Sequence, residues 1–267
     1  MALPLPTSLS PSKVSAFRDC ALAFRFSVID RLPEPPTVAA AKGTLVHRAL
    51  ELLHCRPADE RTPDVARQCL DEAVPEILGS EEYGVLELED PRAFVAEAAE
   101  LVGRYFELED PTAVNAIGLE LRMEAEVGGV RLRGIIDRLD LDADGSLVVT
   151  DYKTGKVPRE RYEQGKLGGV HFYAYLCEAV LGRRPSRIQL LYLAQPVAIV
   201  AVPSEQSIRG LERRVGAIWT AVERACAQDD FRPNPGRLCD WCPHKALCPA
   251  FGGDPREATA LAAVGAG

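Results

Sequence analysis

The chain has 267 residues, of which 47% are hydrophobic, and its formal net charge is −8. This length suits one large domain, and no apolar run reaches the roughly 18 residues of a membrane-spanning helix. The acidic balance excludes a protein coated in nucleic-acid-binding charge, although a local basic groove stays compatible with it.

The N-terminus lacks the basic and apolar regions of a secretory signal, so we expect a cytoplasmic protein, and we expect no membrane partner. The first half of the chain then has helical patterns. Ser10-Pro11 predicts the start of a first helix, with Ser10 as the cap, and a proline-rich linker follows at 32–36. A second helix is predicted to begin at Gly43-Thr44. Residues 57–112 are predicted to form two or three acidic amphipathic helices, interrupted at Pro75 and Gly84.

Strand patterns begin near residue 119 and alternate with helical ones to residue 228. The turns between the first three strands are expected at Gly128-Gly129 and at 142–145. The predicted strands are 119–124, 130–141, 147–153, 188–193 and 197–202, and the predicted helices are 168–181 and 204–228. This order predicts an α/β fold: a central mixed sheet flanked by helices, with a helical insertion at 57–112.

Two of these strands carry acids at defined places. Asp137 lies in Gly134-Ile135-Ile136-Asp137-Arg138, and the next strand contains Asp151-Tyr152-Lys153. Residues i and i+2 of a strand point to one face, so Asp151 and Lys153 project together. Two carboxylates for a divalent cation beside an ammonium group suit the hydrolysis of a phosphate ester. The alternative is an ordinary surface salt bridge on a hairpin.

Four further residues fit this pair. His47 follows Gly43-Thr44, and an imidazole can complete a cation site built of carboxylates. Glu120 alternates with Leu119 and Leu121 on the preceding strand, while His171 and Tyr175 share a helix face. Each has a simpler alternative: a helix-face histidine for His47, a solvent-side acid for Glu120, and a core position for Tyr175.

The chain has eight cysteines. In a reducing cytoplasm structural disulfides are disfavoured. Cys55, Cys69, Cys177 and Cys226 are single and are interpreted as core or surface thiols. Cys239, Cys242 and Cys248 cluster with the spacing C-x2-C-x5-C, which is typical of a metal site. Spacing leaves iron–sulfur and zinc open, and His244 offers a Cys₃His zinc alternative.

These motifs together resemble a known family. Gly43-Thr44-Leu45-Val46-His47, a glutamate before a G-x-x-D-R strand, and Asp151-Tyr152-Lys153-Thr154-Gly155 look like the RecB-type branch of the PD-(D/E)XK nucleases. The resemblance is strongest to the stand-alone RecB-family exonucleases that carry an iron–sulfur cluster, and it spans residues 9–251. It implies a restriction-endonuclease-like core in a single nuclease domain at 1–252, followed by a flexible tail at 253–267.

The resemblance also implies roles. His47, Asp137, Asp151 and the Tyr152 backbone carbonyl would ligate Mg²⁺ or Mn²⁺, with Glu120 near the metal. Lys153 would orient or help deprotonate the attacking water and stabilise transition-state charge. Catalytic roles thus fall on Asp137, Asp151, Lys153 and Glu120. His171 and Tyr175 would contact substrate, although the family usually has glutamine where His171 stands.

By the same resemblance, Cys20, Cys239, Cys242 and Cys248 would hold a [4Fe–4S] cluster that staples the first helix to the C-terminal segment. Cys20 departs from the family pattern, because alanine follows it where proline is more usual.

The predicted function is a metal-dependent DNA exonuclease on single-stranded or end-exposed DNA, in repair or recombination. No G-x-x-x-x-G-K-[ST] motif occurs, so a helicase partner or previously opened DNA would be needed. The alternatives are an endonuclease, a trimming nuclease of the CRISPR-adaptation type, and a non-catalytic iron–sulfur DNA-binding subunit.

Overall fold

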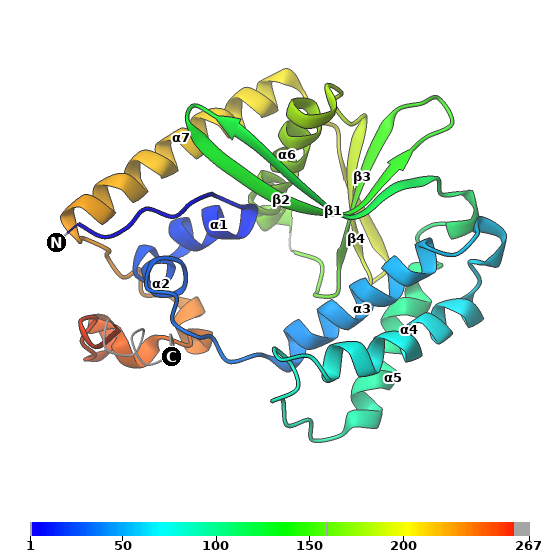
Figure 1. The fold of residues 1–267 in the computed structure, drawn as a ribbon, viewed down its shortest axis with the longest axis horizontal. Coiled ribbons are helices and arrows are strands. Elements are labelled where there is room, and N and C mark those ends of the chain that lie inside the picture. Colours follow the sequence, from blue (N-terminus) through cyan, green and yellow to red (C-terminus); the bar gives the residue numbers. More distant parts are fainter. Residues whose placement is uncertain (1, 159, 259–267) are drawn as a thin grey trace. The chain divides into compact units, whose positions relative to one another are not determined.

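The structure is a computed structural model that describes residues 2–158 and 160–258, with the backbone alone at 160–168. Within these residues the strands form one five-stranded sheet in the order β1-β2-β3-β4-β5 (Figure 1). β2 and β3 are antiparallel, β3 and β4 parallel, and β4 and β5 antiparallel. The strands are β1 (Ala116–Val127), β2 (Val130–Leu141), β3 (Leu147–Lys153), β4 (Arg187–Tyr192) and β5 (Val197–Ala201). The predicted mixed α/β fold is confirmed.

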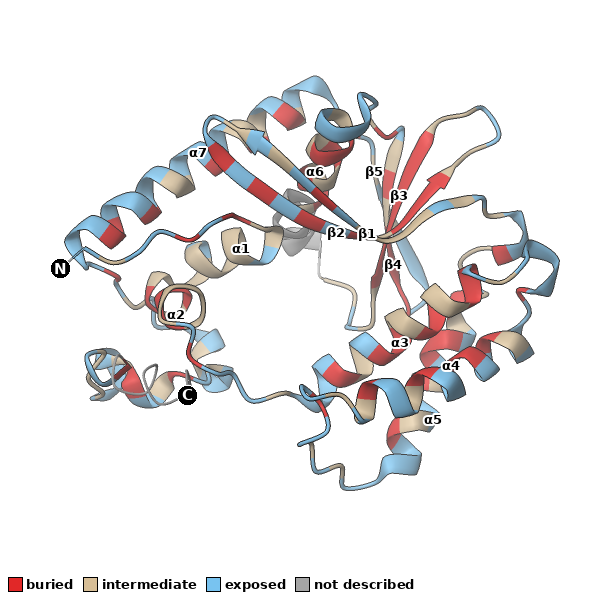
Figure 2. Ribbon diagram, in the orientation of Figure 1, coloured by how far each residue is buried: buried red, intermediate tan, exposed pale blue. Residues whose placement is uncertain are grey.

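Two short turns set the first strand connections. Gly128 and Gly129 have φ angles of 55° and 80°, the left-handed backbone that a two-residue hairpin turn needs. Between β2 and β3 the amide of Gly145 donates to the carbonyl of Asp142 at 2.8 Å. β3 runs between β2 and β4 and is buried along nearly its whole length (Figure 2). The one acid of β3, Asp151, therefore lies in the interior of the sheet, away from its edges.

The chain divides into two compact units, and the larger comprises Pro36–Met123 and Ile135–Ile208. It holds a helical core made by α3 (Val38–His54), α4 (Pro63–Leu78) and α5 (Pro91–Tyr105). Their buried residues gather where the three helices face one another (Figure 2). The same unit contains α6 (Glu160–Leu181), which connects β3 to β4.

Two predicted boundaries in this unit are wrong. α3 begins at Val38 and not at Gly43, because the Thr37 side chain caps the earlier start by accepting a 3.1 Å hydrogen bond from the Ala40 amide. Pro75 does not interrupt the block, since it lies inside α4. Its ring removes one backbone donor, but the buried face of α4 packs on α3 and carries the helix through.

The smaller unit comprises Met1–Pro35, Glu124–Gly134 and Arg209–Gly267. It contains α1 (Pro11–Asp19), capped by Ser10 as predicted, α2 (Ala21–Phe24), and most of α7 (Glu205–Gln228). A π-helical turn follows α2, and three short 3₁₀ turns, η4 (Arg237–Trp241), η5 (Lys245–Leu247) and η6 (Pro249–Phe251), follow α7. Its core joins α2, α7 and the η5 turn through residues that include Phe24, Val222 and Leu247.

None of the helices described is both long and apolar enough to cross a lipid bilayer. Most of the predicted tail at 253–267 lies outside the described residues.

Candidate active site

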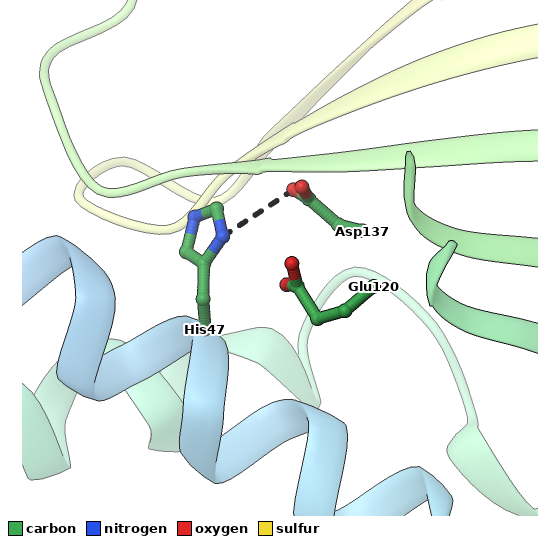
Figure 3. A group of neighbouring side chains, drawn as sticks. All are labelled: His47, Glu120 and Asp137. Carbon is green, nitrogen blue, oxygen red and sulfur yellow. Dashed lines mark ion pairs between the residues drawn. The ribbon is translucent and has the colours of Figure 1, made fainter. Parts of the chain in front are cut away.

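Three potential metal ligands from distant parts of the sequence meet in the larger unit. His47 comes from α3, Glu120 from β1 and Asp137 from β2, and one ligand atom of each lies within 4.8 Å of the others. Figure 3 shows the three side chains pointing toward one another. Nδ1 of His47 is 3.5 Å from Oδ2 of Asp137. These three residues were all predicted from sequence to belong to one site.

Glu120 reaches this group through an unusual backbone. Its φ angle is +43°, in the left-handed region that residues with a side chain rarely adopt. The regular alternation of burial along β1 is lost around this position. Backbone strain of this kind costs about 1–3 kcal/mol and is concentrated at functional sites. Alternation alone would have assigned Glu120 to the face opposite Leu119 and Leu121, so this local conformation was not visible in the sequence.

Strand pairing brings the second acid to the same place. Arg138 of β2 is opposite Thr150 of β3, so Asp137 and Asp151 follow at the next position of each strand. The Tyr152 amide donates a 2.7 Å hydrogen bond to Oδ2 of Asp137. The Tyr152 carbonyl lies 3.1 Å from Nε2 of His47. The backbone of Tyr152 therefore contacts two members of the metal-ligand group.

Asp151 and Lys153 form an ion pair on the face that the sequence predicted. Asp151 is 5% exposed, whereas the Lys153 side chain is 40% exposed, so the acid of this pair is buried and its lysine reaches the surface. Burial alone would lower the pKa of Lys153, but the carboxylates of Asp151 and Asp137 outweigh it and raise that pKa. Lys153 therefore stays an ammonium group in this environment.

The electrostatics of the three-residue group favour a bound cation. Burial, and then the charge of Asp151, raises the pKa of Asp137 to about 7. Burial, and then the charge of Asp137, also raises the pKa of Glu120, while burial lowers the pKa of His47. Neutral imidazole and crowded carboxylates are a donor set that a divalent cation stabilises, because it replaces the lost hydration and cancels the repulsion. The residues present fit Mg²⁺ or Mn²⁺.

The sequence comparison agrees with this geometry. Residues 8–249 match the family model of the PD-(D/E)XK nuclease superfamily. The chain belongs to this superfamily. None of the curated proteins matches it significantly.

Among solved structures, this nuclease is similar to one from Eubacterium rectale described as a "Putative exonuclease". The two align with a TM-score of 0.53 and 12% identity, over 89% of this chain and 88% of that one. The structure of SSO0001 aligns with a TM-score of 0.40 and 14% identity, over 79% of this chain and 95% of that one. The E. rectale structure supports the fold of the nuclease.

Helix α6 adds one residue to the site that the sequence did not reveal. The Tyr173 hydroxyl donates to Oδ1 of Asp151 at 3.4 Å. His171 and Tyr175, predicted as substrate contacts, are half-buried on the same helix. Tyr173 stands between them in sequence but on another helix face. Only the rotation of α6 relative to β3, which sequence periodicity does not give, identifies the tyrosine that contacts Asp151.

The smaller unit of the nuclease contains the cysteine group. Cys20, Cys239, Cys242 and Cys248 line one cavity and are all half-buried. Burial raises the pKa of the Cys242 thiol, and the other three cysteines add to that increase. The four cysteines that the sequence placed outside the group, Cys55, Cys69, Cys177 and Cys226, do not line this cavity, and three of them are buried.

His244, the alternative zinc ligand, lines the same cavity. Its Nε2 lies 3.4 Å from a carboxylate oxygen of Glu34, and its ring packs edge-on against Phe26 at 5.4 Å between centroids. These two contacts hold the His244 ring in the wall of the cavity.

Proposed function

We propose that this nuclease is a metal-dependent DNA exonuclease of the RecB type. It would act on single-stranded or end-exposed DNA in repair or recombination. The proposal is carried by the convergence of His47, Glu120 and Asp137 beside the ion pair of buried Asp151 with the partly exposed Lys153. A purely DNA-binding subunit would have no use for crowded acids whose ionised forms are penalised by burial.

In this proposal His47, Asp137, Asp151 and the Tyr152 carbonyl hold Mg²⁺ or Mn²⁺, with Glu120 beside them. A cation bound there supplies a more acidic water and a polarised phosphoryl oxygen. Asp137 is held for this role by the Tyr152 amide. Asp151 is held by Lys153 and by the Tyr173 hydroxyl.

Lys153 would orient the attacking water and stabilise the charge that develops on the phosphate. Its raised pKa keeps it protonated, which favours this electrostatic role over proton abstraction. His171 and Tyr175 on α6 remain the proposed substrate contacts.

We also propose that Cys20, Cys239, Cys242 and Cys248 hold a [4Fe–4S] cluster. All four cysteines line one cavity, and four thiolates are the ligand set of such a cluster. The cluster would join α2 to the C-terminal turns. Zinc held by the same cysteines is the alternative.

The test of the exonuclease activity compares linear with circular single-stranded DNA in Mg²⁺, in Mn²⁺ and in EDTA. We expect metal-dependent degradation of the linear strand, and no cleavage of the circle. Strands blocked at the 5′ or 3′ end would then give the polarity. Cleavage of the circle would instead indicate an endonuclease, and DNA binding without cleavage would indicate a non-catalytic subunit.

A helicase partner belongs to the same proposal, because the sequence has no nucleotide-binding motif for its own unwinding. Blunt duplex DNA should therefore be a poor substrate until it is opened. Degradation of blunt duplex at the single-strand rate would count against this requirement.

A further inference from the structure

Arg138 is a fully buried arginine directly after Asp137, and its side chain is 0% exposed. Nε donates to Oδ1 of Asp140 at 2.8 Å, and Nη2 donates to the other Asp140 oxygen at 3.0 Å. Nη2 also donates to the Thr150 hydroxyl at 3.1 Å. Nη1 forms an ion pair with Glu109. A guanidinium at this depth requires such partners, because an unpaired buried charge is strongly destabilising.

The partners of Nη1 come from the helical block as well as from the sheet. His54 of α3 lies 2.9 Å from Nη1, and the Tyr105 hydroxyl of α5 lies 3.1 Å from it. Tyr105 donates in turn to Glu109 at 2.6 Å, and the Gln189 amide of β4 donates to Glu109 at 3.2 Å. The single side chain of Arg138 therefore contacts α3 and α5, which precede the sheet, as well as the central strand β3.

One partner of Arg138 connects this network to the candidate metal group. Nη1 donates to the Tyr152 hydroxyl at 2.7 Å, and the guanidinium lies 5.7 Å from the centre of the Tyr152 ring. The backbone of the same tyrosine donates to Asp137 and places its carbonyl 3.1 Å from His47. Tyr152 thus has its side chain in the network of Arg138 and its backbone among the metal ligands.

We propose that Arg138 is a positioning residue: by holding the Tyr152 hydroxyl it sets where the Tyr152 carbonyl and amide stand relative to His47 and Asp137. This inference rests on the proposed metal-dependent activity. A buried charge network contributes little net stability compared with apolar packing. We therefore infer that its role is to fix the position of the Tyr152 backbone. Groups behind a metal ligand commonly orient it and tune its affinity.

The test is the affinity for Mn²⁺ alone, measured by titration calorimetry on the full chain, together with thermal unfolding. Tyr152→Phe removes the hydroxyl that Arg138 holds and leaves the backbone and the ring in place. We expect the dissociation constant for Mn²⁺ to rise about tenfold, as is typical when a partner behind a metal ligand is lost.

Thr150→Val is the matched control. Thr150 contacts the same guanidinium from the same strand face, two residues earlier, and also accepts from Gln189 at 2.9 Å. This variant should lose thermal stability to a similar extent but keep the wild-type Mn²⁺ affinity. Equal Mn²⁺ affinity in Tyr152→Phe and wild type would overturn the inference, as would an equal loss of affinity in both variants.

Cleavage gives a second readout. Excess Mn²⁺ should restore most of the kcat of Tyr152→Phe, because the site is displaced but intact, whereas Asp137→Ala should not recover. Arg138→Lys keeps the positive charge but loses the planar guanidinium with its several N–H donors. This variant should show the same recovery of kcat in excess Mn²⁺ as Tyr152→Phe. A wild-type chain that neither binds Mn²⁺ nor cleaves DNA would refute the proposed function itself. A wild type that does both, beside an unaffected Tyr152→Phe, would refute only the role of Arg138.

Discussion

The amide of Tyr152 donates a 2.7 Å hydrogen bond to Oδ2 of Asp137, from β3 to β2. This bond fixes one carboxylate oxygen of a residue whose pKa is raised to about 7 by burial and by Asp151. The fold therefore holds Asp137 in place although its charge is unfavourable there. A bound cation would offset that cost, because its charge counters the repulsion between Asp137 and Asp151.

Asp137→Asn should greatly lower the activity and stabilise the metal-free protein. The amide removes a ligand charge, so we expect cleavage to fall by about 10³-fold. At pH 8 in EDTA, loss of a repelled buried anion should raise the melting temperature by a few degrees. With Mn²⁺ present only the wild type should gain stability. Scanning fluorimetry with and without Mn²⁺ checks this, with the exposed Asp59→Asn as control; a lower melting temperature in EDTA would contradict it.

Lys153→Ala should lose catalysis while retaining DNA binding. The ammonium group is held against Asp151 at the site, and removing one charge-stabilising group typically costs about 10²–10³-fold in rate. Lys156, three residues later and exposed, provides the matched control, and Lys156→Ala should cleave normally. The measurement is kcat on single-stranded DNA, with binding followed in EDTA. A Lys153→Ala variant that cuts at the wild-type rate would show that the site is wrongly assigned.

Acid should destabilise the protein through His54. Burial, then the charges of Arg138 and Arg61, lowers the pKa of His54 from 6.5 to about 2. Below pH 6.5 the unfolded chain binds a proton at His54 that the folded chain does not bind. The contribution of neutral His54 to the free energy of unfolding is therefore complete above pH 6.5 and is lost as the pH falls toward 2. Over this range the free energy of unfolding should fall by about 1.4 kcal/mol for each pH unit.

His54→Gln isolates this effect, because glutamine can still accept from Arg138 but does not titrate. Urea unfolding at several pH values should show the wild type losing stability relative to His54→Gln as pH falls from 6.5 to 4.5. Parallel pH profiles for the two proteins would mean that His54 is not held neutral.

Cysteine variants should separate the cluster from the active site. Cys239→Ser should lose iron and sulfide, and it should unfold at a lower temperature because α2 is no longer tied to the C-terminal turns. Cys55, exposed at the end of α3, is the control, and Cys55→Ser should keep its iron. Iron and acid-labile sulfide analysis of anaerobic protein is the measurement. One zinc and no iron in the wild type would exclude the cluster.

The sequence by itself pointed to His47, Glu120, Asp137, Asp151 and Lys153 and to the elements that carry them, but not to Tyr173. Asp137, Asp151 and Lys153 lie on strands whose turns contain glycines with the required left-handed φ, so the pairing of β2 with β3 followed from local chemistry. Helix ends were less predictable. The start of α3 follows from a local cap at Thr37 that the prediction from sequence missed. The passage of α4 through Pro75 depends on packing that outweighs local preference.

Tertiary structure alone decided how these side chains face one another. The positive φ of Glu120, the contact of Tyr173 with Asp151 and the burial of Arg138 have no local signal. Each depends on the angle at which a helix or strand packs on its neighbour, and hydrophobic periodicity specifies a face without specifying that angle. The sequence thus determined the chemistry available to the site, whereas the packing of α3, α5 and α6 on the strands determined which backbone and side-chain atoms meet there.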